Sequence, residues 1–191
     1  MIGNDIVDLK IAAKESNWKR PRFLNKVFTT DEQELIANAS NQHQTVWLLW
    51  SMKEAAYKIY VQQSGIRFFN PLKLACNFDS TSNGIVTIEN TTFFTTSVFS
   101  EKHIYTIAVS KILQNYHSTC LKIDNSSAIV QSDTLKNRLL KTISKDKNLN
   151  INYLHIRKNE VGIPEVFFMN TKLSIHVSLT HSGNFCGYVY F

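Results

Sequence analysis

Three polar side chains share one stripe of a segment that is otherwise rich in bulky apolar residues. In LWSMKEAAYK, which spans Leu49 to Lys58, the side chains of Ser51, Glu54 and Lys58 fall within about 60° of one another on a helical projection. Burying an ionised Glu or Lys costs several kcal/mol unless the charge is paired or holds a metal. The stripe therefore indicates a reaction centre. The alternative is an ordinary Glu–Lys pair, four residues apart on a helix surface.

A second acidic feature lies near the N-terminus. GNDIVDL places Asp5 and Asp8 in a short predicted strand, where residues three apart face opposite ways, and Asp5 is the better metal ligand of the two. Mg²⁺ takes one or two protein carboxylates and completes its shell with waters and substrate phosphates. Asp5 from a strand and Glu54 from a helix meet that need. The alternative is that Asp5 or Asp8 caps a turn.

Length and composition limit the elements that can position these residues. The 191 residues are enough for one large domain or two small packed halves, and a chain with 43% hydrophobic and 19% charged residues fits a soluble, globular α+β protein. No apolar run approaches the roughly 20 residues that span a bilayer. MIGNDIVDLK is too acidic for a signal peptide, and Cys76, Cys120 and Cys186 show no metal-binding spacing. We therefore expect a cytoplasmic protein with reduced thiols.

The net charge of +6 is unevenly distributed along the chain. Residues 1–110 hold 11 Lys+Arg and 10 Asp+Glu, whereas residues 111–191 hold 10 and 5. A basic surface attracts phosphates, nucleic acid or an acidic protein, so a basic nucleic-acid-binding protein is one alternative function. That alternative leaves the carboxylates unexplained, and the sequence has no RNP, helix-turn-helix or zinc-finger signature.

The first half of the chain reads as helices followed by strands. Thr29 or Thr30 can cap a helix that has acids in its first turn, and a long helix runs from about Thr45 to about Gln62, with Gly65 as its terminator. After Pro71, four β-rich segments separated by polar turns predict antiparallel hairpins: LKLACNF, GIVTIE, TTFFTTSVF and HIYTIAVS.

The second half repeats that order. Residues 114–132 are predicted to connect the halves, and a helix follows from about Asp133 to about Lys145, with apolar residues on one face. The strands INYLHIRK, PEVFFM and SIHVSLTHSG…CGYVYF complete this half. The pattern predicts two lobes, 1–112 and 113–191, that together form one unit.

Several motifs, in their order along the chain, resemble the 4′-phosphopantetheinyl transferase superfamily. GNDIVDL, VFTTDE and LWSMKEAAYK are similar to its G-x-D, F-[ST]-x-x-E and W-x-x-K-E-x-x-x-K elements, and VSLTHSG and LKNRLLKTI resemble parts of its other half. The resemblance covers nearly the whole chain and is weakest around 70–130. Two positions depart from the pattern: Asn4 precedes the motif aspartate, and Ile163 in GIPEV replaces a basic residue. One phosphate contact must therefore be absent or supplied elsewhere.

The resemblance implies an α+β fold of two similar lobes, each with a long helix packed on a small antiparallel sheet. Such a chain is a pseudo-dimer in one polypeptide. The half with the THS strand comes last here, whereas it comes first in the surfactin-type enzymes, so the lobe order is exchanged relative to them. We expect a monomeric pseudo-dimer.

The resemblance also implies a reaction and roles for residues. Coenzyme A would donate its 4′-phosphopantetheine arm to a serine of an acyl or peptidyl carrier protein, releasing adenosine 3′,5′-bisphosphate. Asp5 and Glu54 would hold Mg²⁺, with Mn²⁺ as the alternative, and Glu54 would help to remove the serine proton. Lys58 would pair with phosphate oxygens and stabilise developing charge.

Further contacts follow from the same resemblance. Arg138, Thr180 and His181 would contact the phosphates of coenzyme A from the second lobe, although a solvated helix face and a structural histidine are the alternatives for Arg138 and His181. Glu32 would be a third acid near the metal or simply a first-turn acid. Ser51 has no assigned role beyond a small size that lets the site approach the helix.

The implied partners are coenzyme A and an acidic carrier protein, with no nucleic acid and no membrane. The basic segment Lys10–Lys26 suits carrier docking, with a solvated loop as the alternative. The carrier, and whether it serves lipid or secondary-metabolite biosynthesis, is left open by the sequence. A degenerate family member that binds carriers without transferring anything is a further alternative.

Overall fold

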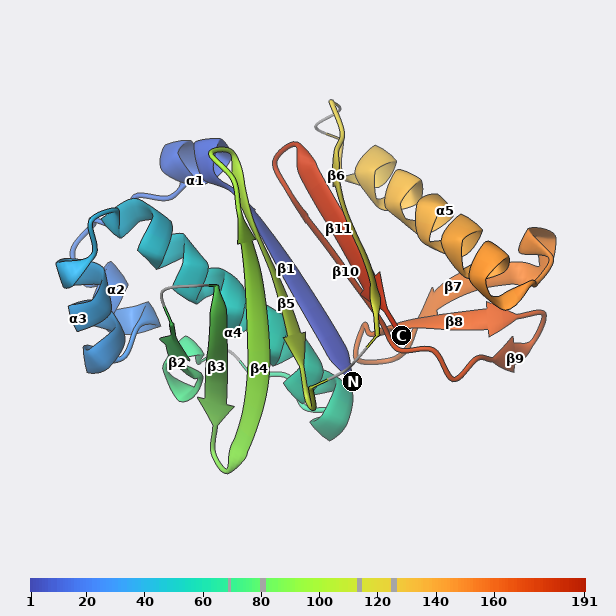
Figure 1. Ribbon diagram of the computed structural model, residues 1–191, viewed down its shortest axis with the longest axis horizontal. Coiled ribbons are helices and arrows are strands. Elements are labelled where there is room, and N and C mark those ends of the chain that lie inside the picture. Colours follow the sequence, from blue (N-terminus) through green and yellow to red (C-terminus); the bar gives the residue numbers. More distant parts are fainter. Residues whose placement is uncertain (69, 80–81, 113–114, 125–126) are drawn as a thin grey trace.

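The computed structural model describes residues 1–191 except 69, 80–81, 113–114 and 125–126. Two groups of elements lie on either side of the N-terminal strand, β1 (Ile2–Asp8), as Figure 1 shows. In the described part of the chain, no helix is long and apolar enough to cross a membrane.

The first lobe is a five-stranded antiparallel sheet with one face covered by a long helix (Figure 1). Its strand order is β1-β5-β4-β3-β2, in which the further strands are β2 (Ala75–Phe78), β3 (Asn83–Ile88), β4 (Thr91–Phe99) and β5 (His103–Val109). The covering helix is α4 (Gln42–Ser64), and its apolar side chains form the lobe's core with those of the sheet. The smaller helices are α1 (Leu9–Glu15), α2 (Phe23–Val27), α3 (Thr30–Asn38) and the 3₁₀ turn η1 (Pro71–Lys73).

The predicted caps of these helices are confirmed. Thr29 caps α3 in a capping box, in which its hydroxyl accepts from the N–H of Glu32 and the Glu32 carboxylate accepts from the N–H of Thr29. Gly65 ends α4 in the left-handed conformation, with φ 69°, that glycine adopts without strain. The long helix is a few residues longer at each end than the sequence predicts.

The second lobe contains one long helix and two small antiparallel sheets (Figure 1). One sheet has the order β10-β11-β6, from β6 (His117–Lys122), β10 (Val177–Ser182) and β11 (Phe185–Tyr190). The other comprises β7 (Leu154–Lys158), β8 (Pro164–Phe168) and β9 (Thr171–Lys172), preceded by the turn η2 (Ile151–Tyr153). The helix α5 (Ala128–Lys147) buries Leu135, Leu139 and Ile143 against them. The α+β fold of two lobes is as expected, with two sheets in the second lobe.

The predicted connection over 114–132 is wrong for much of its length. His117–Lys122 forms β6, which pairs with β11 at the edge of its sheet, and α5 begins at Ala128 rather than near Asp133. The first turn of α5 exposes Ile129 (74%) and Val130 (41%), which breaks the apolar-face pattern by which a helix is recognised. The predicted lobe boundary at 112/113 falls at Leu113, outside the described residues.

β1 is buried along its whole length because the two lobes cover its two faces. Ile2 and Ile6 pack toward the second lobe, in a cluster that includes Tyr105, Phe185 and Val189. Val7 packs on the opposite face, in the core beneath α4. Because alternate side chains of a strand face opposite ways, Gly3, Asp5 and Val7 share the face toward α4.

Candidate active site

Gly3 determines how closely α4 approaches β1. A Cβ atom at this position would lie 2.1 Å from the carbonyl oxygen of Ala55 and 3.2 Å from the side chain of Ile59. Ser51 and Ala55 are fully buried and lie one turn apart on the same side of α4. Small residues on both elements therefore bring the helix backbone against the strand, which places the polar stripe of α4 over Asp5.

Asp5 is buried at the contact between the lobes. Its Oδ1 accepts a hydrogen bond from Thr180 Oγ1 at 3.2 Å and lies 3.6 Å from Lys58 Nζ. Burial raises the pKa of the Asp5 carboxyl, while the Lys58 charge and the hydrogen bond from Thr180 act in the opposite direction. The residue is 9% exposed.

Lys58 connects α4 to both lobes. Its Nζ donates to the carbonyl oxygen of Asn4 at 2.6 Å and to that of Leu179 at 3.5 Å, in addition to its ion pair with Asp5. Among the described residues, no Glu54–Lys58 ion pair closes to within 4 Å. The ordinary helix-surface pair is therefore not what the stripe forms, because Lys58 reaches across to the strand instead.

Glu54 is the second carboxylate of the site. Burial, and then the negative charge of Asp5, raise the pKa of Glu54 to about 7, and the Lys58 charge partly offsets this rise. The two carboxylates are thus close enough to repel each other, and the Lys58 ammonium attracts both of them. A divalent cation would stabilise two buried carboxylates that repel each other when both are ionised.

The residues present fit a hard divalent cation. Asp5 and Glu54 supply two oxygen ligands of the kind that Mg²⁺ prefers, and Mg²⁺ completes its shell with waters and phosphate oxygens. The fully buried hydroxyl of Ser51 makes no hydrogen bond of standard geometry within the described residues, yet it is near enough to Asp5 to lower the pKa of that carboxyl. No group of three or more His, Cys, Asp or Glu side chains that could hold a metal occurs in the described part of the chain.

A cleft of about 230 Å³ opens beside Lys58, between α4 and the second lobe. Its basic side chains are Lys58, Lys136, Lys158 and His181, and Ile163 contributes an apolar wall. Tyr57 also borders a second cavity of about 240 Å³ that contains Glu54. A larger hollow of about 600 Å³ lies on the five-stranded sheet, away from these carboxylates. The cleft beside Lys58 is therefore the better candidate for an anionic ligand.

The structure brings some of the sequence-predicted site residues together and places others elsewhere. Asp5, Glu54 and Lys58 come together, and His181 lines the cleft. Thr180 bonds to Asp5 and to the N–H of Ile6, so its hydroxyl is directed at the strand and not at the cleft. Arg138 is on an exposed face of α5 and does not line the cleft, to which α5 contributes Ser132, Leu135 and Lys136.

Glu32 and Asp8 have structural partners instead. Glu32 is fully buried, lies 2.8 Å from Lys53 Nζ and accepts from the N–H of Cys76. Asp8 caps α1 by accepting from the N–H groups of Lys10 and Ile11, and it also accepts from the N–H of Asn184. Neither carboxylate is free to join the site, and for Asp8 the turn-capping alternative is the one observed.

Sequence reasoning missed three cations near the cleft. Lys136 and Lys158 line it, and the Arg67 guanidinium lies beside Gly162, where a Cβ atom would come within 2.4 Å of it. Lys158 faces Pro164 across the β7–β8 pair, next to Ile163. The available signal was the basic end of INYLHIRK, whose last residue, Lys158, lies five positions before Ile163.

The comparisons with known proteins identify the family of the chain. The ACPS family model, described as the 4′-phosphopantetheinyl transferase superfamily, matches residues 1–120, and the chain belongs to that superfamily. Membership supports a phosphopantetheinyl transferase function.

Among solved structures, the chain is similar to the crystal structure of holo-[acyl-carrier-protein] synthase (AcpS) from Neisseria meningitidis. The sequence identity is 15% and the TM-score is 0.43, over 56% of this chain and 94% of that chain. No curated protein matches the chain.

Proposed function

We propose that this protein transfers the 4′-phosphopantetheine arm of coenzyme A to a serine of an acyl or peptidyl carrier protein. The observation that carries the proposal is the closeness of Asp5 and Glu54 to Lys58, which itself lines a cleft between α4 and the second lobe. Phosphoryl-group transfer depends mainly on positioning and on stabilising negative charge, and these residues supply both.

Asp5 and Glu54 would hold the divalent cation, and this is the simplest use of two adjacent buried carboxylates. A bound Mg²⁺ supplies charge neutralisation on the pyrophosphate as the transfer proceeds. Lys58 pairs with a phosphate oxygen, since this residue already lines the cleft. Lys136, Lys158 and His181 hold the remaining phosphate charge, which compensates for Ile163 at the position where the family has a base.

The transfer itself exchanges one phosphorus–oxygen bond for another. The serine oxygen of the carrier attacks the β-phosphorus of coenzyme A, and the bond from that phosphorus to the bridging oxygen breaks. Adenosine 3′,5′-bisphosphate leaves with the bridging oxygen, and Glu54 accepts the serine proton. Burial and the Asp5 charge raise the pKa of Glu54 to about 7 in the cation-free protein, and a bound cation would lower it.

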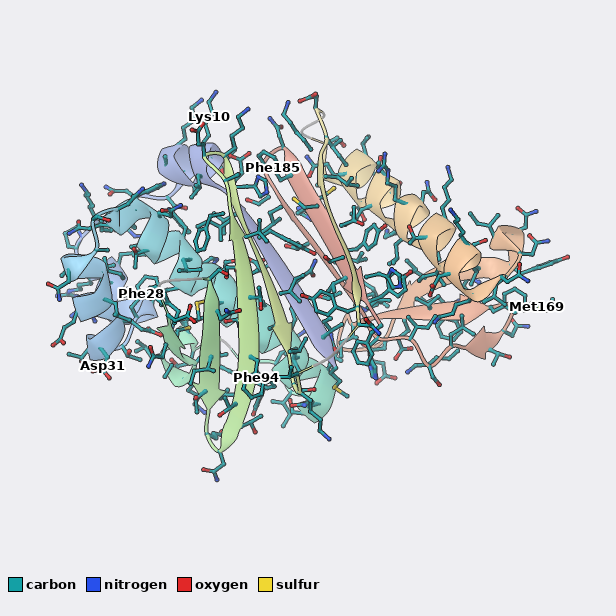
Figure 2. The ribbon with its side chains drawn as sticks, viewed as in Figure 1. Lys10, Phe28, Asp31, Phe94, Met169 and Phe185 are labelled. Carbon is teal, nitrogen blue, oxygen red and sulfur yellow. The ribbon has the colours of Figure 1, made fainter. Side chains whose placement is uncertain are left out.

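The carrier would dock at the basic surface of α1 and α2. Lys10, Lys14, Lys19, Arg20, Arg22 and Lys26 are all exposed, and within the described residues none of them forms an ion pair with an acid. Figure 2 shows Lys10 projecting from α1 at the end of the molecule where Phe185 of β11 also lies. Unpaired rim charges of this kind accelerate the encounter with an acidic partner.

The proposal is tested by incubating the protein with coenzyme A, Mg²⁺ and several apo carrier proteins, and then weighing each carrier by mass spectrometry. We expect a mass gain equal to one phosphopantetheine arm, lost on adding EDTA and restored by Mg²⁺ or Mn²⁺. The Glu54→Gln variant should fold and transfer nothing. No gain on any carrier would contradict the proposal, and salt-dependent DNA binding without affinity for coenzyme A would favour the nucleic-acid alternative.

A further inference from the structure

Within the described residues, no strand pairs directly with one edge of β1. β5 takes up one side of β1 over its whole length, and on the other side the N–H groups of Asn4, Ile6 and Asp8 point toward β10. A buried edge with unpaired backbone groups is costly, so something must satisfy them.

Side-chain hydroxyls do so, one at every second residue of β10. Asn4 N–H donates to Ser178 Oγ at 3.2 Å, Ile6 N–H to Thr180 Oγ1 at 3.2 Å, and Asp8 N–H to Ser182 Oγ at 3.1 Å. We call these three contacts the hydroxyl ladder. They join the two lobes through side chains, so the two sheets meet at β1 and β10 (Figure 1) without a backbone pairing between them.

Side chains of α4 satisfy the carbonyl groups of the same strand. Gln62 Nε2 donates to the Ile2 oxygen at 3.0 Å, and Lys58 Nζ donates to the Asn4 oxygen at 2.6 Å. Lys58 Nζ also donates to the Leu179 oxygen of β10 at 3.5 Å, so Lys58 belongs both to the lobe contact and to the candidate site.

The middle contact of the ladder does more than the other two. A threonine hydroxyl has one proton to donate, and Thr180 Oγ1 donates it to Asp5 Oδ1 at 3.2 Å while accepting from Ile6 N–H. Both neighbours fix the direction of these bonds, because an N–H group can only donate and a carboxylate can only accept. Among the described residues, Thr180 is the ladder hydroxyl that contacts a carboxylate.

We propose that Thr180 is a positioning residue: it seats one oxygen of Asp5 and so couples the placement of the second lobe to the geometry of the cation site. Thr180 and Lys58 both engage Oδ1 of Asp5, so together they fix the orientation of this carboxylate beside Glu54. The inference deepens the proposed function, because it rests on Asp5 being a ligand of the divalent cation in that reaction.

The test measures Mn²⁺ binding by electron paramagnetic resonance, with and without coenzyme A, for wild type and four variants. Thr180→Val keeps the shape of the side chain and removes the hydroxyl, and Thr180→Ser keeps the hydroxyl. Ser178→Ala and Ser182→Ala each remove one ladder contact without touching Asp5. Loss of a group that orients a metal ligand typically weakens metal affinity about 10–100-fold.

We expect weaker Mn²⁺ binding, by roughly tenfold or more, in Thr180→Val. Wild-type binding is expected in Thr180→Ser, Ser178→Ala and Ser182→Ala. All of the variants that lose a hydroxyl should show a lower melting temperature, because each leaves an N–H group of β1 unpaired. In transfer assays, Thr180→Val should need more Mg²⁺ for half-maximal activity, with an unchanged KM for coenzyme A at saturating Mg²⁺.

Three results from the variants would overturn the inference. These are wild-type Mn²⁺ affinity in Thr180→Val, equal weakening in the two serine variants, and a raised KM for coenzyme A at saturating metal, which would make Thr180 a phosphate contact instead. Absence of Mn²⁺ binding by the wild-type protein would also reject it. If Mn²⁺ binding follows the expected pattern and no carrier is modified, the proposed transfer fails while the positioning role stands.

Discussion

The two carboxylates of the candidate site are held by different means. Asp5 Oδ1 is held by the Thr180 hydroxyl and the Lys58 ammonium, whereas Glu54 projects from α4 and is repelled by the Asp5 charge. The pKa of Glu54 therefore lies near neutrality in the free protein, and the buried negative charge of the ionised form lowers the stability of the fold. A group poised in this way binds either a proton or a cation.

The first prediction concerns the pH dependence of stability. The folded pKa of Glu54 is about 7, above its ordinary value of 4.5, so its stabilising contribution is complete below pH 4.5 and is lost as the pH rises through 7. The glutamine of Glu54→Gln cannot ionise. The stability of the variant relative to wild type should therefore increase as the pH rises from 5 to 8. Melting temperatures of the metal-free proteins at both pH values measure this.

Exposed Glu34, changed to Gln, is the control and should show little pH-dependent difference from wild type. At pH 8, added Mg²⁺ should make the wild-type protein more stable than Glu54→Gln, because the wild-type carboxylate gains a cation and the amide does not. A constant difference between Glu54→Gln and wild type across the pH range would show that Glu54 does not titrate in this window.

At the scale of elements, the closeness of α4 to β1 determines the site. Gly3→Ala would place a methyl group 2.1 Å from the Ala55 oxygen, and the helix would have to move away. We expect a loss of about 2 kcal/mol or more in unfolding free energy. Mn²⁺ affinity should also fall markedly, because moving α4 away from β1 separates Glu54 from Asp5. Chemical denaturation and metal titration measure the two effects.

Gly65→Ala is the matched control at the end of the same helix. Gly65 has φ 69° with nothing within 4 Å, so a Cβ there costs about 1–2 kcal/mol of backbone strain without displacing α4 from β1. Its metal affinity should equal that of wild type. If both glycine variants bind Mn²⁺ normally, close approach of the helix is not what forms the site.

The ion pair between Lys53 and Glu32 fixes a different part of α4. Lys53 Nζ donates to the carbonyl oxygens of Pro71 and Leu74 as well as pairing with Glu32 at 2.8 Å. Lys53→Met leaves a buried carboxylate without its cation, which should cost about 3–5 kcal/mol. Adding Glu32→Gln should restore part of that loss, whereas Lys122→Met, at the exposed Lys122–Asp124 pair, should change stability by less than about 1 kcal/mol. Urea denaturation of the four proteins tests this, and equal losses from the two lysine variants would contradict it.

Much of the first lobe could be predicted because local signals there agree with the fold. The cap at Thr29, the terminator Gly65 and the alternating strands after Pro71 each act within a few residues. The second lobe was harder to predict from the sequence, because β6 is a polar edge strand whose pairing with β11 depends on residues more than 60 positions away. The roles of Lys53 and Thr180 also depend on distant partners, although a hydroxyl at every second residue of VSLTHS is a pattern that could have indicated an edge contact.

At the scale of the whole molecule, the two basic regions have different tasks in the proposed reaction. Exposed lysines and arginines of α1 and α2 lie on the first lobe, while Lys136 and Lys158 enclose the cleft from the second. The first set lies on the outer surface of the first lobe, whereas the second set borders a cleft, with Lys158 itself exposed and Lys136 Nζ 3.6 Å from Asp133 Oδ1. A large acidic protein suits the first and a small polyanion suits the second.

The last prediction separates these tasks by charge reversal. Lys10→Glu with Lys14→Glu should raise the KM for the carrier protein by about tenfold at low salt, leave the KM for coenzyme A unchanged, and lose its effect as ionic strength rises. Lys136→Glu with Lys158→Glu should raise the KM for coenzyme A and leave that for the carrier unchanged. Arg138→Glu, on the same helix but outside the cleft, is the control. A raised KM for coenzyme A in Arg138→Glu would show that this side chain reaches the nucleotide, as the sequence predicts. An unchanged KM in that variant, beside a raised KM in the Lys136 and Lys158 pair, would assign the phosphate contact to the cleft-lining face of α5.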